Sequence, residues 1–384
     1  MKNLTDKFKE NSQYKGSASM DLSSVELLTS FKKYLPKTTK KVFNSNNKEL
    51  FNENSILNQY KLPLVLGTDE NKNPIIIDFA SQTSGIILGN ISTGKTTQLV
   101  NTLLIFSILN SYKEHQFILF DVKNSTVLNQ FRYLPHTLGY HTDSTTFLDV
   151  LREVSVEMER RNTLCLKENV VNIHELQEKY KHENKYDELE SIADITLVFF
   201  EQTFLFNQLK TYYSSTENPE LYEEFVSILR KIAEEGRSLG IRSLYESQRV
   251  NQGSLDKNIT LNSSFKLIYK LLGNDDLELM VGKYLTKSLN TPINKLSIGD
   301  FYLKSIDEEE SLIKGKNIEP IENTIENIKE LIKVIGLDWQ RRIIDTNTNL
   351  TKKPKKYPFN ITFNRNNMIK ESQKELTDLM KNEE

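Results

Sequence analysis

The stretch "GIILGNISTGKTTQLV", Gly85 to Val100, decides the fold of this chain. Within it, residues 89–96 ("GNISTGKT") fit the pattern G-x-x-x-x-G-K-[ST] at every fixed position. Such a pattern also occurs by chance in ordinary glycine loops. Here a short apolar strand precedes the loop and an apolar helix follows it, which is the context of a phosphate-binding loop. The stretch therefore predicts a nucleotide-binding site.

Each part of this loop has a physical purpose. Gly89 and Gly94 permit backbone conformations that a Cβ would forbid, so that successive N–H groups can point at phosphate oxygens. The helix that begins near Lys95 adds the positive end of its dipole. Lys95 would reach the β- and γ-phosphates of ATP, and the Thr96 hydroxyl would ligate Mg²⁺. The residues expected to contact the nucleotide are Gly89, Asn90, Ile91, Ser92, Thr93, Gly94, Lys95, Thr96 and Thr97.

Composition sets looser limits. The 384 residues are 27% charged with a formal net charge of −2, so contact with nucleic acid would have to come from local patches. The single cysteine, Cys165, cannot form an internal disulfide, which favours a reducing, cytoplasmic setting. No run approaches about 18 apolar residues, so no direct membrane insertion is expected. A link to a membrane would come through a partner protein.

Apolar strands and amphipathic helices alternate along the middle of the chain, which predicts an α/β fold with mainly parallel strands flanked by helices. A hairpin is expected in "LPLVLGTDENKNPIIIDF" (62–79), and one helical face carries Phe147, Leu151, Val154, Met158 and Cys165. Further strands are expected at 116–121, 194–202, 241–249 and 264–272, with helices at 96–112, 147–165 and 221–240; the last should stop at Gly236 or Gly240.

The segments on either side of this pattern are polar. Residues 1–60 are lysine-rich with weak periodicity, and the helix expected at 25–35 is short, so we interpret them as an accessory segment. Residues 61–305 form the predicted nucleotide-binding domain, and residues 306–384 a polar extension.

Hydrolysis of ATP needs a second carboxylate for Mg²⁺ and a group that orients or deprotonates the attacking water. Such groups usually follow a neighbouring buried strand. Three strand ends offer them: Asp121 in "ILFDVKN", Glu201-Gln202 in "LVFFEQ" and Gln248 in "LYESQR".

Several motifs occur in the order found in one family. They are "GNISTGKTT", "FILFDVK", "VEMERRNTL", "EEGRSLGIRSLYESQR" and "IGDFYL". From Leu62 to Leu303 the chain resembles the FtsK/SpoIIIE-type ATPases of the FtsK–HerA group. The resemblance implies a RecA-like P-loop NTPase core, and "IGDFYL" stands where the family has a Gly-Asp before its last core strand.

One motif departs from that family. "LVFFEQ" stands where the family usually has Asp-Glu, which places Glu201 on the magnesium side and Gln202 at the catalytic glutamate. Glutamine can orient water but cannot take its proton. In the alternative register, Glu201 is the catalytic glutamate and Phe200 replaces the aspartate. Either way the second nucleotide motif is degenerate, which predicts firm ATP binding and slow hydrolysis.

Other residues carry weaker expectations. The resemblance makes Arg237 a candidate to reach the phosphates of a neighbouring subunit, although an arginine there could equally cap its own helix. Gln248 fits a γ-phosphate sensor, and Asp121 could hold metal-bound water or cap a turn. The five histidines show no metal-ligand spacing.

Two functions remain open at this stage. The first, which is the main interpretation, is a ring-forming ATPase with weak hydrolysis that moves double-stranded DNA, as in conjugation or mobile-element transfer; the resemblance implies a hexamer. The second is a degenerate ATPase module of the type VII secretion kind, which binds ATP structurally and recognises a protein partner. Gln202 favours the second function.

Overall fold

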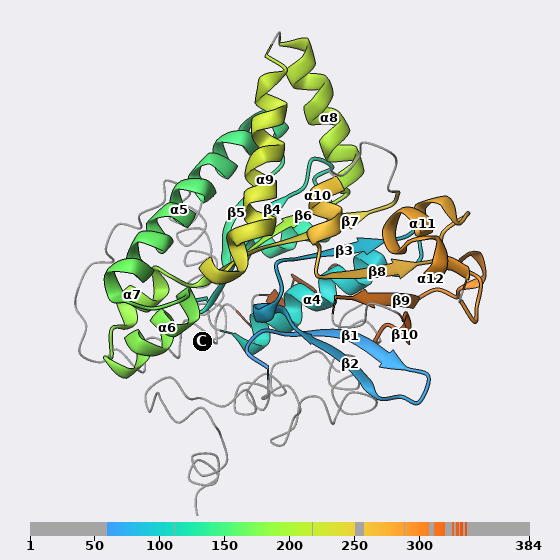
Figure 1. Cartoon of the computed structure of the whole chain (residues 1–384), viewed down its shortest axis with the longest axis horizontal. Helices are drawn as coiled ribbons and strands as arrows, with labels where there is room; N and C mark the ends of the chain where they lie inside the picture. The colour runs from blue at the N-terminus through green and yellow to red at the C-terminus, as the bar shows by residue number, and fades with distance from the viewer. Residues whose placement is uncertain are drawn as a thin grey trace, which may run out of the picture.

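The computed structural model describes residues 60–110, 112–216, 218–249, 257–287, 289–306 and 311–318, with helical positions 325, 328, 329, 331, 332 and 335. The helix expected at 25–35 lies outside these residues. The described chain folds around one ten-stranded sheet with the order β2-β1-β10-β9-β8-β3-β7-β6-β4-β5 (Figure 1).

Six neighbouring strands of this sheet run parallel, as the alternation of strands and helices predicts. They are β3 (Ser84–Leu88), β4 (His115–Phe120), β5 (Thr137–His141), β6 (Asp194–Phe199), β7 (Ile241–Ser247) and β8 (Phe265–Tyr269). The strand β7 lies between β3 and β6 and pairs with both. The carboxyl ends of these three strands therefore meet at one edge of the sheet.

The other four strands are antiparallel: β1 (Pro63–Asp69), β2 (Pro74–Asp78), β9 (Asp300–Ser305) and β10 (Ile313–Lys316). The hairpin expected in residues 62–79 is confirmed as β1 and β2. The last core strand expected at "IGDFYL" is β9. The sheet also extends past residue 305, because β10 pairs with both β1 and β9.

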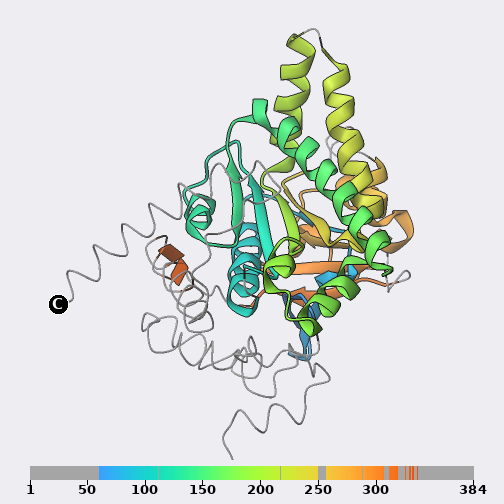
Figure 2. The ribbon, with the colours of Figure 1, turned by 90° about the vertical axis from the view of Figure 1, so that its left-hand side faces the viewer.

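Helices cover the two faces of the sheet and make three layers. Helix α4 (Lys95–Leu109) lies on one face, and α5 (Phe147–Glu168), α8 (Gln202–Ser215) and α9 (Glu220–Leu239) lie on the other (Figures 1 and 2). Side chains alternate between these layers along each strand. In β3, Ile87 packs in the cluster that contains α4, whereas Ile86 and Leu88 pack in the cluster that contains α5 and α9.

The long helices follow the sequence pattern closely. All five side chains expected on one face of α5 are buried, including Cys165. Helix α9 ends at Gly240, whose φ of +70° suits glycine, while Gly236 lies within the helix. Helix α8 was not expected, and it forms with α9 an antiparallel pair that projects beyond the sheet (Figure 1).

Shorter elements complete the described chain: α6 (Ile173–His182), α7 (Tyr186–Glu190), α10 (Lys257–Asn262), α11 (Asp275–Val281), α12 (Lys283–Lys287), and the 3-10 turns Phe79–Ser81, Leu128–Tyr133, Ser144–Thr146 and Ile293–Lys295. Within the described ranges, no helix combines the length and the apolar character needed to cross a membrane.

Candidate nucleotide-binding site

The loop of residues 89–96 joins the carboxyl end of β3 to the amino end of α4, as the motif predicts. Gly94 precedes the helix with a φ of +108°, which a residue with a Cβ rarely adopts. A Cβ on Gly89 would lie 2.5 Å from the Cβ of Tyr269 on β8, so this position also needs glycine. Thr96 and Thr97, in the first turn of α4, are half-buried. The local geometry is that of a loop open to a ligand at a helix N-terminus.

Residues from the far end of the sequence brace this loop. Gly299 donates its N–H to the Thr93 carbonyl at 2.9 Å. The Asn317 side chain donates to the Gly94 carbonyl at 3.1 Å, and it accepts a hydrogen bond from the Tyr269 hydroxyl at 2.6 Å. These hydrogen bonds fix the Thr93 and Gly94 carbonyls, and so help to hold the loop in its shape just before α4. No motif in the sequence pointed to Asn317.

Lys95 is buried and engaged by its own surroundings. Its ammonium donates to the Asn90 carbonyl at 2.8 Å and lies 3.5 Å from Oε1 of Glu246. Burial lowers the pKa of the Lys95 ammonium, and the carboxylates of Glu246 and Glu201 act in the opposite direction. A phosphate at the loop would compete with these contacts for the lysine.

Glu246 is the carboxylate that sequence analysis missed. It lies on β7 and is 1% exposed, between the strand of the phosphate loop and β6. Burial raises the pKa of Glu246 to about 7; Lys95 opposes this rise and Glu201 adds to it. A perturbed carboxyl beside a phosphate-loop lysine marks a functional position. The available signal was a charged residue inside a strand that should be apolar on both faces.

Glu201 is the second residue after β6 and has a left-handed conformation with a φ of 51°. Its backbone N–H donates to Oε2 of Glu246 at 3.1 Å. Its own carboxylate accepts a hydrogen bond from the Gln248 amide and lies 3.4 Å from the Lys123 ammonium. The structure thus brings Lys95, Glu201 and Gln248 into one network, joined through Glu246.

The remaining candidates lie differently. Gln202 begins α8 with its side chain fully buried. Asp121 is also buried, and it caps the turn after β4 by accepting hydrogen bonds from Ser125 N–H at 2.7 Å and the Tyr140 hydroxyl at 2.8 Å. Arg237 is exposed in the last turn of α9, which leads into the amino end of β7. It therefore lies near the edge of the sheet opposite to the phosphate loop.

The residues present fit magnesium only in combination with phosphate oxygens. Mg²⁺ prefers oxygen ligands and commonly uses one or two carboxylates, a hydroxyl, waters and substrate phosphates. Thr96, Glu201 and Glu246 supply oxygens of this kind. Across the described residues there is no group of three or more His, Cys, Asp or Glu side chains that would hold a metal by itself.

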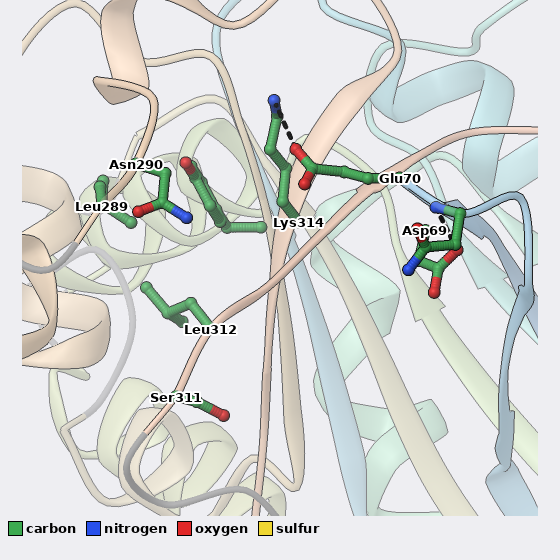
Figure 3. A pocket seen from close by; sticks show the side chains of 9 residues that line it. Asp69, Glu70, Leu289, Asn290, Ser311, Leu312 and Lys314 are labelled. Carbon is green, nitrogen blue, oxygen red and sulfur yellow. Dashed lines mark hydrogen bonds and ion pairs between the residues drawn. The ribbon is translucent and has the colours of Figure 1, made fainter.

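A separate hollow of about 460 Å³ lies beside the antiparallel half of the sheet (Figure 3). Its apolar lining comes from Leu289, Leu312 and Tyr302. At its rim, the Lys314 ammonium lies 3.1 Å from the Glu70 carboxylate. None of the nucleotide-site residues named above lines this hollow.

The sequence pattern of the family described as "FtsK/SpoIIIE family" matches residues 49–250, just over half of the chain. The type VII secretion system protein EssC of Staphylococcus aureus (strain NCTC 8325 / PS 47) is 26% identical over 227 residues, which cover 58% of this chain and 14% of EssC. The chain thus spans only a small part of the curated relatives it matches.

Two solved structures show the same fold. The pCW3 conjugation coupling protein TcpA, in a monomer form with ATPγS, is similar with a TM-score of 0.56 and 16% identity, over 71% of each chain. Thermomonospora curvata EccC (ATPases 2 and 3), in complex with a signal sequence peptide, is similar with a TM-score of 0.56 and 19% identity. That likeness covers 73% of this chain and 48% of the EccC chain.

Proposed function

Because this chain belongs to the FtsK/SpoIIIE family of P-loop ATPases, we propose that it is an ATP-binding module of the type VII secretion kind. In this proposal it holds Mg·ATP at residues 89–97, hydrolyses it slowly, and recognises a protein partner. The similarity to EssC and to the EccC complex with a peptide supports this class of partner over DNA.

The observation that carries the proposal is the contrast between a complete loop and an altered strand end. The phosphate loop has every expected residue and is braced by Gly299 and Asn317. Beside it, Gln202 is fully buried, and an amide could not take a proton from water in any case. These features favour binding over rapid turnover.

We further propose that copies of the chain form a ring, with six as the expected number. Arg237 and the phosphate loop lie at opposite ends of β7, which at about 3.3 Å per residue puts them roughly 20 Å apart. Arg237 therefore could not serve the nucleotide of its own subunit. In a ring, its exposed guanidinium would contact the nucleotide of the next copy and add positive charge to the transition state.

Binding of Mg·ATP to the full chain and to Lys95→Ala tests the proposal, with Lys167→Ala as the control because Lys167 is exposed on α5. Loss of the lysine should weaken binding about tenfold or more, since a charged contact to phosphate is lost. The control should bind like the wild type. Equal affinity in all three proteins would contradict nucleotide binding at this loop.

The same proteins distinguish the secretion-type proposal from DNA transfer. Turnover and particle size are measured in ATP, with and without double-stranded DNA. We expect slow turnover that DNA leaves unchanged. Turnover that rises strongly with DNA would favour the DNA-transfer function instead, and a chain that stays monomeric in ATP would contradict the ring.

A further inference from the structure

Strand register places Phe200 and Glu246 side by side. Phe199 on β6 is paired with Tyr245 on β7, and their rings stack with centroids 5.0 Å apart in the layer of α5 and α9. Because side chains alternate along a strand, the next residues on both strands face the opposite layer, which contains α4. Phe200 indeed packs in the α4 cluster, and Glu246 reaches Lys95 at the start of α4.

Position 200 is thus where a carboxylate at the end of β6 would point beneath the phosphate loop, and this chain has phenylalanine there. P-loop NTPases hold Mg²⁺ between the hydroxyl of the loop and an aspartate that follows such a strand. A phenylalanine ring cannot do this. The neighbouring strand supplies a carboxylate that faces the same layer, one strand nearer to the loop.

The Glu201 side chain has different surroundings from those of Glu246. Its carboxylate remains partly exposed, with 14% of the side chain accessible, and contacts Gln248 and Lys123 rather than Lys95. Its backbone N–H holds Oε2 of Glu246, which leaves Oε1 directed at the lysine. The two glutamates are therefore coupled but not interchangeable. Glu246 is buried beside the loop lysine, whereas the Glu201 carboxylate is open to solvent.

We propose that Glu246 supplies from β7 the magnesium-side carboxylate that Phe200 cannot supply from β6, leaving Glu201 to orient the water. This assignment rests on the proposed function, because it requires Mg·ATP at the loop. When bound, the metal would neutralise phosphate charge. Glu246 would be one of the groups that hold it, and the lysine would be released to the phosphates. The two carboxylates of the second nucleotide motif then come from Glu246 on β7 and from Glu201 after β6, and Gln202 has no role in it.

A purely structural alternative is that Glu246 only neutralises Lys95. The two roles differ in what magnesium does. If Glu246 is a counter-ion, its removal changes ATP affinity equally with and without the metal. If it is the magnesium-side carboxylate, its removal abolishes the gain in affinity that the metal gives. ATP binding without metal should then be unchanged or tighter, because a negative charge next to the lysine is gone.

The test measures ATP affinity in Mg²⁺ and in EDTA for the wild type, Glu246→Gln and Glu201→Gln. Glu223→Gln is the matched control, since Glu223 is exposed on α9. Glu246→Gln should lose about tenfold of the magnesium-dependent gain, as is usual when a group that holds a metal's ligands is removed. Glu201→Gln and the control should keep the gain. A folded Glu246→Gln with the full gain would overturn the assignment.

Two further variants sharpen the result. Phe200→Asp added to Glu246→Gln returns a carboxylate to β6, and it should restore the magnesium-dependent gain. If Glu246→Gln does not fold, the paramagnetic spectrum of Mn²⁺ bound with ATP is compared between the wild type and Glu246→Asp. An identical spectrum would overturn the assignment. Failure of the wild type to bind ATP at all is a different outcome, because it would reject the proposed function itself.

Discussion

The two ends of the strand pair β6–β7 each carry a buried acid beside a buried base, but the pairs are built differently. At the amino end, Asp194 contacts Arg242, His174 at 3.0 Å and Gln177 at 3.3 Å. The guanidinium of Arg242 also donates to the carbonyls of Ala80 and Gln82 at 2.7 and 3.1 Å. At the carboxyl end, Glu246 and Lys95 are 3.5 Å apart.

The pKa values of the two acids move in opposite directions. Burial alone would raise the pKa of Asp194, but Arg242 and His174 outweigh it and hold that pKa well below its usual range. Burial dominates at Glu246, whose pKa is raised to about 7 because Lys95 compensates only in part. A fully partnered buried pair stabilises a specific fold, whereas an incompletely partnered one is available to a ligand.

Removing the acid of the Asp194–Arg242 pair should have the largest effect on stability. Asp194→Ala leaves the fully buried Arg242 without its carboxylate, which should lower the free energy of unfolding by about 3 to 5 kcal/mol. Urea denaturation measures this. The control is Asp149→Ala, which removes an exposed ion pair with Arg152 and should cost about 1 kcal/mol or less. Equal losses of unfolding free energy in the two variants would show that the buried Asp194–Arg242 pair stabilises the fold no more than an exposed ion pair does.

Acid should weaken the same end through His115, the register partner of Asp194 on β4. Burial lowers the pKa of His115 to about 3, with Asp194 opposing and Arg242 and His136 adding to the shift. Below pH 6.5 the unfolded chain binds a proton that the folded chain does not bind until about pH 3. The contribution of His115 to the free energy of unfolding should therefore decrease as the pH falls, by about 2 kcal/mol from pH 6.5 to pH 5, while the raised pKa of Glu246 contributes with the opposite sign in the same window.

Replacing the histidine isolates its contribution. His115→Gln keeps a polar group near the Thr196 hydroxyl, which His115 contacts at 2.8 Å, and should remove this contribution from the dependence of stability on pH, so that the variant loses less stability than the wild type on going from pH 6.5 to pH 5. His182→Gln, at an exposed position of α6, is the control and should leave the slope as it is. The prediction fails if both variants keep the slope of the wild type.

The smallest effect is expected at Asn317, which supports the phosphate loop. Asn317→Ala removes the hydrogen bond to the Gly94 carbonyl and the acceptor of the Tyr269 hydroxyl. One neutral hydrogen bond contributes about 1 kcal/mol, so Mg·ATP should bind about fivefold more weakly. Calorimetric titration measures this, with the exposed Asn290→Ala as the control. Unchanged affinity would mean that the loop keeps its shape without Asn317.

The sequence predicts those parts of the fold whose pattern is local. The phosphate loop, the first hairpin, the parallel strands and the buried face of α5 all follow from residues close together in the chain. Among the parallel strands, β5 was not predicted because "TLGYH" contains glycine and few apolar residues. The antiparallel strand β10 was not predicted because "IKGK" is short. Both are stabilised by neighbouring strands, which a local pattern does not show.

The site was predictable in part for the same reason. Residues 89–97 are a contiguous motif, and Glu201 follows a recognisable strand. The choice between two registers for "LVFFEQ" depends on which side chain faces α4, and only strand pairing shows this. Glu246 lies 45 residues from Glu201 in sequence, so nothing local connects them. Asn317 is more distant still.

The brace also sets an order of assembly. Gly94 and Asn317 are separated by 223 residues, and contacts of such long range form only after much of the intervening chain has folded. Synthesis proceeds from the N-terminus, so the ribosome releases the phosphate loop well before the residue that braces it. A nascent or truncated chain that stops before β10 has the whole loop sequence but lacks this support. Full affinity for nucleotide is therefore acquired late, after β10 has joined the β1–β2 hairpin to the rest of the sheet.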